Sequence, residues 1–155
     1  MGPSNADWLL QLSMMSARKR LWIANAYFLR SNNLVEALEH QVRAGVDVRV
    51  LVPGAIYDVP SIRAAQRSSY ARLLQAGVHI REYQASMMHA KTLVVDDTLS
   101  VIGSMNLDPL SMNRLEEGSL LVLDHAVNDD LAQHDVADLT HAKEMTPDSA
   151  EIPGL

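Results

Sequence analysis

The chain of 155 residues contains no cysteine, which excludes disulfide bonds, thiol catalysis and cysteine-ligated zinc. It also lacks an excess of positive charge. A formal net charge of −6 argues against a strongly held nucleic-acid partner, because such a partner usually binds a net basic face. No apolar run approaches the roughly 18 residues that a membrane span requires, and the start shows no signal-peptide pattern. We therefore expect a soluble or peripheral protein, cytoplasmic by default.

The length suits one domain, and 48% apolar with 21% charged residues is typical of a globular one. Hydrophobic periodicity predicts helices over residues 7–18, 31–45, 61–77 and 128–143, with Ser31 and Ser61 as N-caps. It predicts strands over residues 20–27, 46–52, 78–83, 88–95, 99–102 and 118–123. This order predicts an α/β fold in which helices flank both faces of a mixed sheet. We expect a single domain over residues 7–145, with flexible ends at 1–6 and 146–155.

Two polar side chains, those of His89 and Lys91, stand at the start of an apolar strand pattern. Side chains at positions i and i+2 of a strand point to the same face, so this spacing predicts that they emerge side by side. The next residues on that face, Leu93 and Val95, are apolar and belong to the predicted core. The pair thus lies at the end of a buried strand, where open sheets place ligand sites.

A second group of polar residues, Gly103-Ser104-x-Asn106, follows the neighbouring strand of the predicted hairpin. The hairpin returns this segment towards the strand start that bears His89. Glycine permits close backbone approach, while serine and asparagine supply neutral donors. An imidazole, a fixed cation and neutral donors together predict a site for a phosphate-like anion.

These residues resemble the signature of the phospholipase D superfamily, H-x-K-x4-D-x6-G-S-x-N, often called the HKD motif. The chain reads His89-x-Lys91-x4-Asp96-x6-Gly103-Ser104-x-Asn106 with every spacing kept. The surrounding segments resemble the cardiolipin synthase branch, in particular the second half of such a synthase. The likeness covers roughly residues 7–143.

The resemblance implies a phospholipase D-like α-β-α sandwich and a reaction without metal or other cofactor. His89 would be the nucleophile that forms a phosphohistidine, or its partner acid. Lys91 and Asn106 would bind the phosphoryl oxygens with help from Ser104, and Glu117 would orient the histidine. Asp96 and Gly103 would be structural positions of the motif.

The implied activity is that of a phosphatidyltransferase or phosphodiesterase acting on a phospholipid, with peripheral contact to the bacterial inner membrane. Two alternatives stay open. One is a metal-independent, homodimeric nuclease of the same superfamily, and the other is an inactive half-domain. Nucleic acid is the less expected substrate because of the net acidity.

The chain carries one complete motif, whereas active sites of this superfamily use two. His141-Ala-Lys143 repeats the first part of the motif, but it falls in a helical pattern and has no downstream Gly-Ser-x-Asn. We therefore expect either a symmetric homodimer or a missing N-terminal half.

Plainer interpretations apply to several other residues. His134, Asp138 and His141 share one predicted helix face, where a solvated surface is more expected than a metal site. Tyr27 and Phe28 are compatible with a substrate channel, although buried packing is the commoner role of such residues.

Overall fold

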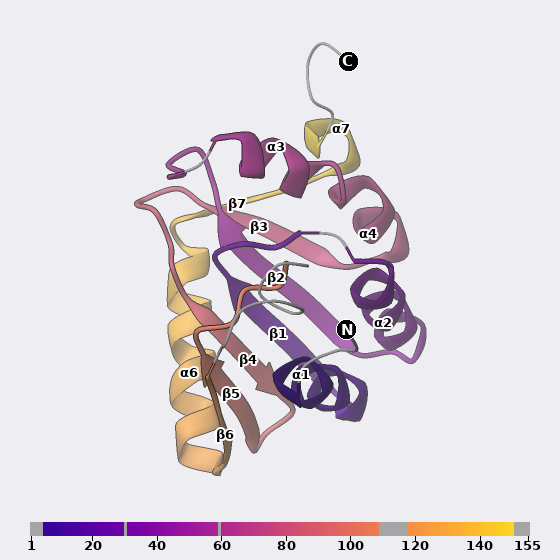
Figure 1. The fold of residues 1–155 in the computed structure, drawn as a ribbon, viewed down its shortest axis with the longest axis vertical. Coiled ribbons are helices and arrows are strands. Elements are labelled where there is room, and N and C mark those ends of the chain that lie inside the picture. Colours follow the sequence, from indigo (N-terminus) through magenta and orange to yellow (C-terminus); the bar gives the residue numbers. More distant parts are fainter. Residues whose placement is uncertain (1–4, 30, 59, 109–117, 151–155) are drawn as a thin grey trace.

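The computed structural model describes residues 5–29, 31–58, 60–108 and 118–150. Within them the chain forms a seven-stranded mixed sheet in the order β6-β5-β4-β1-β2-β3-β7 (Figure 1). The strands are β1 Arg20–Asn25, β2 Asp47–Pro53, β3 His79–Tyr83, β4 Lys91–Val95, β5 Leu99–Gly103, β6 Ser119–Leu123 and β7 Ala142–Glu144. The helices are α1 Asn5–Ser16, α2 Asn32–Arg43, α3 Pro60–Arg67, α4 Tyr70–Ala76, α6 His125–Leu139 and α7 Pro147–Ala150. Strands β1, β2 and β3 run parallel, whereas β4, β5, β6 and β7 each pair antiparallel with a neighbour.

The central strands build the main core: burial alternates in the first half of β1 and β2 and is continuous in the second half. Leu21 and Ile23 of β1 and Val48 and Val50 of β2 are buried against side chains of α1, α2 and α4. Helix α6 packs on the other face of the sheet, where Leu139 joins a smaller cluster around Leu51 and Met88. Helices therefore cover both faces, and the predicted α/β class with a mixed sheet is confirmed. None of the helices in the described part of the chain combines the length and apolar character needed to cross a membrane.

The predicted hairpin is present as β4 and β5, and Asp96 fixes its turn. Asp96 adopts the left-handed backbone conformation with φ 50°, which aspartate tolerates better than most residues. Its carboxylate accepts hydrogen bonds from the backbone N–H groups of Arg18, Lys19 and Arg20 at 2.7 to 3.1 Å. Asp96 thus attaches the start of β1 to the far end of β4.

A buried ion-pair network joins α3 to β3. The side chain of Glu82 is 1% exposed and accepts two hydrogen bonds from Arg67, each 2.8 Å, and one from Arg63 at 3.2 Å. Burial by itself raises the pKa of Glu82, but the hydrogen bonds and charges of the two arginines outweigh it and hold this pKa below its usual range. Removing either partner of such a pair leaves a buried charge unpaired, which costs free energy. The network therefore holds α3 against the sheet.

Two predictions about residues 61–77 were wrong. The helix expected over residues 61–77 is divided into α3 and α4, because Ser68 and Ser69 turn their hydroxyls back onto the carbonyls of Ala65 and Gln66. Its predicted cap, Ser61, lies inside α3, which begins at Pro60, since proline suits the first helical position.

The last helix does not extend from residue 128 to 143. It begins at His125, because Asp124 caps it by accepting a hydrogen bond from Val127 N–H at 2.9 Å. It ends at Leu139, since residues 142–144 pair with β3 as strand β7. The segment His141-Ala-Lys143 therefore does not lie in a helix, and tertiary pairing overrides the local helical pattern there. The cap predicted at Ser31 is confirmed, because its hydroxyl accepts from Leu34 N–H at 3.2 Å.

Helix α6 turns one carboxyl group, that of Asp135, towards the sheet. It borders a small cavity with Trp22, Arg49 and Arg81. Its Oδ2 atom is buried and has no hydrogen-bond partner among the described residues. Burial, and then the charge of Asp138, raise the pKa of Asp135 to about 7.

This raised pKa makes the stability contribution of Asp135 depend on pH. The folded chain holds this proton up to a higher pH than the unfolded chain, so stability falls as pH rises from about 4 to about 7. Asp135→Asn removes the ionisation, and we expect it to raise the free energy of unfolding at pH 8 by roughly 2–4 kcal/mol. The gain should vanish near pH 4, as measured by urea unfolding across this range. Asp130→Asn, at an exposed position of the same helix, is the control. Parallel pH profiles for Asp135→Asn and the wild type would contradict the assignment.

Candidate active site

The side chains of His89 and Lys91 meet at one end of the sheet. Lys91 Nζ lies 2.9 Å from His89 Nδ1, 3.4 Å from Nε2, and donates to the His89 carbonyl oxygen at 3.0 Å. The imidazole is exposed, while the lysine is half-buried at the first position of β4. The strand was predicted from residue 88, but it begins at Lys91, so His89 lies in the preceding segment. The two groups nevertheless converge, and an anion that binds the ammonium group reaches the imidazole as well.

The second motif segment begins where β5 ends, at Gly103. This glycine pairs with Ser119 of β6, and a Cβ atom added to it would lie 2.5 Å from Ser119 Oγ and 2.7 Å from the Gly118 carbonyl oxygen. Ser104 is bound to the same partner strand: its N–H donates to Gly118 O at 2.9 Å, and its hydroxyl accepts from Gly118 N–H at 3.1 Å. The small residue at 103 is therefore required by the close approach of two backbones.

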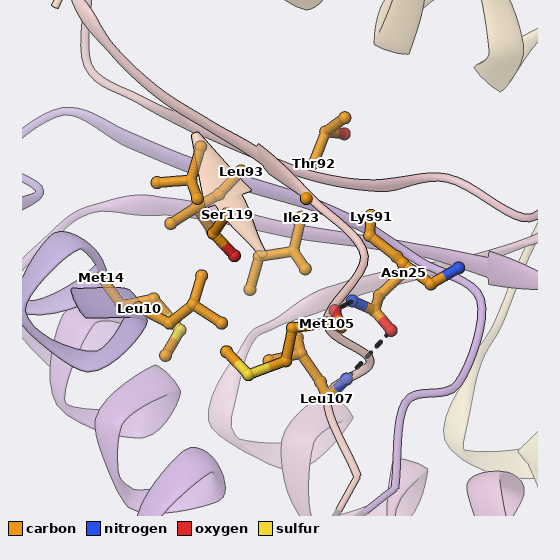
Figure 2. Close-up of a pocket in the computed structure, with 12 residues that line it drawn as sticks. Leu10, Met14, Ile23, Asn25, Lys91, Thr92, Leu93, Met105, Leu107 and Ser119 are labelled. Carbon is orange, nitrogen blue, oxygen red and sulfur yellow. Dashed lines mark hydrogen bonds between the residues drawn. The ribbon is translucent and has the colours of Figure 1, made fainter. Parts of the chain in front are cut away.

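Asn25 joins this segment to the site. It ends β1 and is the sheet partner of Lys91. Its buried amide donates to Met105 O at 3.3 Å and accepts from the N–H group of Leu107 at 3.1 Å (Figure 2). It also accepts from the N–H group of Tyr27 at 3.1 Å. Sequence reasoning missed Asn25, although a lone amide at the end of an otherwise apolar strand was a visible signal.

Asn106 occupies the loop between two core residues. Met105 and Leu107 are both buried, and Leu107 N–H and C=O bond to Asn25 and to Leu29 N–H. Asn106 itself is half-buried between them. The predicted orienting residue Glu117 lies outside the described residues. Asp96 lies at the opposite end of β4 from Lys91, so its role there is in the turn and not at the imidazole.

A narrow pocket lies beneath these residues (Figure 2). Leu10 and Met14 of α1 form its apolar side, and Asn25, Lys91 and Ser119 also line it. Its volume is about 20 Å³, which is room for about one water molecule. A phosphodiester does not fit there, so a substrate that contacts both His89 and Lys91 must approach from the exposed side of the imidazole.

Aromatic side chains stand beside the imidazole. The Tyr27 ring meets the His89 ring edge-on, with centroids 6.0 Å apart and planes at 87°. Phe28 is fully buried, which agrees with the packing role that is commoner for such residues. Tyr27 is half-buried and lies next to the site.

The alternative metal site on the last helix has no counterpart in the described segments. There, no three histidine, aspartate or glutamate side chains gather in a way that would hold a metal ion. His134 instead lies 3.9 Å from Asp130 on its own helix, and both side chains are exposed.

The contact at Gly103 generates a test with a matched control. Gly103→Ala places a methyl group against the β6 backbone, and we expect a loss of roughly 1–3 kcal/mol in unfolding free energy together with displacement of Ser104. Gly118→Ala adds the same methyl group where nothing lies within 4 Å, and we expect little change. Urea unfolding and amide chemical shifts of residues 103–107 measure both effects. Equal stability of the two variants would contradict the proposed close approach.

Comparisons with known proteins place the chain in a family. The family described as "Cardiolipin synthase, PLD-like domain" matches residues 10–138. Cardiolipin synthase A of Pseudomonas entomophila is 37% identical over 135 residues, which cover 87% of this chain and 28% of that protein. Cardiolipin synthase 1 of Bacillus cereus is 33% identical over 148 residues, which cover 93% of this chain and 29% of that protein. The chain thus spans less than a third of the length of these curated relatives.

Solved structures share the fold. A phospholipase D family member, Nuc from Salmonella typhimurium, superposes with a TM-score of 0.78 and covers 94% of this chain and 95% of that chain. The sequence identity is 17%, so this likeness speaks for the architecture alone. The predicted resemblance is confirmed by the family match, which spans most of the sequence: the chain belongs to the phospholipase D-like domain family of cardiolipin synthase.

Proposed function

We propose that this chain supplies one half of the active site of a phospholipase D-type enzyme that transfers a phosphatidyl group between alcohols. The observation that carries the proposal is the 2.9 Å contact between the His89 imidazole and the Lys91 ammonium group at an exposed strand end. Together they present a nucleophile and a cation to one anionic group. The family membership and the names of the relatives support a phospholipid as the substrate.

The proposed reaction has two displacements. His89 attacks the phosphorus of a phospholipid, a phosphorus–nitrogen bond forms, and the bond to the leaving alcohol breaks. A second histidine protonates that alcohol. The same histidine then takes the proton from an acceptor alcohol, whose oxygen attacks phosphorus and releases His89. An acceptor such as the glycerol headgroup of phosphatidylglycerol gives a phosphatidyltransferase, whereas water gives a phospholipase D.

The other motif residues have stabilising roles in this proposal. Lys91, Asn106 and Ser104 bind the phosphoryl oxygens, where negative charge grows during each displacement. Glu117 orients the His89 ring, as an acidic third group does in hydrolytic triads. Side chains of the two motifs carry out this chemistry, and the proposed reaction uses no metal or other cofactor. Because the substrate lies in a bilayer, we propose peripheral contact with the bacterial inner membrane.

The second histidine must come from another copy of the motif. We propose either a symmetric homodimer or the remaining part of a longer polypeptide, and the short share of the relatives that this chain covers supports the latter. The edge strand β6 is a candidate contact surface. It begins at Ser119 beside Gly103, and its side chains Leu120 and Leu123 are 62% and 73% exposed. An exposed apolar edge strand is a typical place for a partner.

The catalytic assignment is tested on vesicles of phosphatidylglycerol in the presence of EDTA, with lipid products followed by mass spectrometry. We expect transfer or hydrolysis that falls by roughly 10²–10⁴ in His89→Ala and strongly in Lys91→Met. His141→Ala, which alters the other histidine with a lysine two residues on, should keep its rate.

Three outcomes would count against the proposal. Turnover that survives His89→Ala removes His89 from its role, and turnover abolished by EDTA contradicts the metal-free reaction. Cleavage of plasmid DNA without any action on lipid favours the nuclease alternative.

The assembly is tested by light scattering coupled to size-exclusion chromatography. If β6 is the contact surface of a homodimer, Leu120→Lys should shift the chain towards the monomer and lower its activity, because a charge would be buried at the contact. Val136→Lys changes an apolar side chain that is 49% exposed on α6 and should leave assembly unchanged. A wild-type chain that is monomeric at all concentrations excludes the dimer and leaves a longer polypeptide as the source of the second histidine.

A further inference from the structure

The contact between Tyr27 and His89 bears on how the imidazole is held. His89 is exposed and precedes the regular part of β4, so the strand does not fix its side chain. The torsion that sets the plane of a histidine ring is intrinsically broad. Lys91 touches the ring, but its ammonium group is a point charge on a flexible stem and does not select one plane. The edge-on Tyr27 ring, with centroids 6.0 Å apart and an angle of 87°, does select one.

Tyr27 is itself held at three points. Its hydroxyl donates a short hydrogen bond to the Asp58 carboxylate, and its backbone N–H donates to Asn25 Oδ1 at 3.1 Å. The Tyr57 ring packs edge-on against the Tyr27 ring, with centroids 5.9 Å apart and planes at 80°. Tyr57 is anchored in turn, because its hydroxyl donates to Ala26 O at 2.9 Å. The Tyr27 side chain therefore cannot swing away from His89 without breaking its hydrogen bond to Asp58, and the Tyr57 ring packs against it.

The same contacts argue against proton transfer by Tyr27. The hydrogen bond to Asp58, with burial and the charges of Asp58 and Asp108 adding to it, raises the pKa of Tyr27 to about 12. The phenol keeps its proton near neutral pH and donates it to Asp58. Its contribution to the site is then geometric.

We propose that Tyr27, held by Asp58, is a positioning residue that acts in addition to Glu117 and fixes the ring plane of His89 for attack on phosphorus. The inference rests on the proposed function, since it assigns His89 the nucleophilic role. It adds that the segment carrying Tyr57 and Asp58, which contains no motif residue, controls the rate through the orientation of the imidazole.

Three variants separate the parts of this arrangement. Tyr27→Phe removes the hydrogen bond to Asp58 and keeps the ring. Tyr27→Leu removes the ring as well, whereas Asp58→Asn keeps the size of the acceptor and removes its charge. The chain offers a matched control, because Tyr83 meets His141 in a similar edge-on contact with centroids 6.3 Å apart and an angle of 78°. Tyr83→Leu removes that contact and leaves Tyr27 in place.

The first measurement is nuclear magnetic resonance of the whole chain with labelled histidine, which needs no turnover. In the wild type, the ring protons of His89 should show cross-relaxation with those of Tyr27 and a ring-current shift. Tyr27→Leu should abolish both, while Tyr27→Phe and Asp58→Asn should keep a weaker, averaged signal. Tyr83→Leu should change the signals of His141 only.

The second measurement is the rate on phosphatidylglycerol vesicles. A misplaced nucleophile lowers the rate of the chemical step, so Tyr27→Leu should lower kcat by roughly 10- to 100-fold and change KM by less than about threefold. Tyr27→Phe and Asp58→Asn should fall between Tyr27→Leu and the wild type. Tyr83→Leu should keep the wild-type kcat.

Specific results would overturn the proposal. Unchanged His89 ring signals in Tyr27→Leu, or an unchanged kcat, would remove Tyr27 from the positioning role, and a rise in KM alone would make it a substrate contact instead. If Tyr27→Leu fails to fold by circular dichroism, Tyr27→Phe and Asp58→Asn decide, and wild-type signals and kcat in both would refute the inference. If a dimeric wild-type chain, which holds two copies of the motif, turns over no lipid, the proposed function fails, while the resonance data still decide whether Tyr27 orients His89.

Discussion

The side-chain amide of Asn25 lies buried where β1 ends, and it bonds the backbone of residues 105 and 107 while accepting the N–H of Tyr27. A buried amide left without partners costs about 1–3 kcal/mol, so these segments do not separate freely. Asn25 is also the sheet partner of Lys91. One residue therefore sets the distance between the cation on β4, the loop after β5 and the aromatic side chain beside the imidazole. The remaining geometry of the site depends on that connection.

The functional side chains lie in irregular segments at the ends of regular strands. Regular strands satisfy their own backbone groups, so functional side chains gather where strands finish and loops begin. Here the loops are held by interactions outside the site. The ion pairs of Glu82 with Arg63 and Arg67 fix α3, and thereby the segment with Tyr57 and Asp58 that precedes it. Asp96 holds the other end of β4 in place by accepting hydrogen bonds from three backbone N–H groups at the start of β1. The segments around the exposed imidazole of His89 are thus held by the buried ion pairs of Glu82 and by the turn at Asp96.

The motif residues and the fold class were predictable because both depend on local spacing. Alternation in residues 46–52 and the acidic turn after residue 95 specify strands and a hairpin within a few residues of the observed bounds. The same holds for the meeting of His89 with Lys91, which are two positions apart. Asn25 and Asp58 were not predictable in this way, because their partners are distant along the chain or their role depends on how a loop folds back. Strand β7 was missed for a related reason: residues 142–144 have a helical pattern, and only pairing with β3 makes them a strand.

In the proposed phosphoryl transfer, His89 supplies the nucleophile, and a second group must supply the proton for the leaving oxygen. In the proposed reaction, His89 presents a lone pair when it attacks phosphorus, and at the same moment the leaving oxygen on the opposite side needs a proton. One imidazole cannot hold both protonation states, nor stand on both sides of the phosphorus. His141 does not supply the second group, because its ring packs against Tyr83 beside β7 and no Gly-Ser-x-Asn loop follows it. The pocket beneath Lys91 is too small for a substrate, so the phosphodiester must lie on the exposed side of His89. In the proposed reaction a second imidazole brought by another motif approaches from that same side, which the exposed His89 ring leaves open.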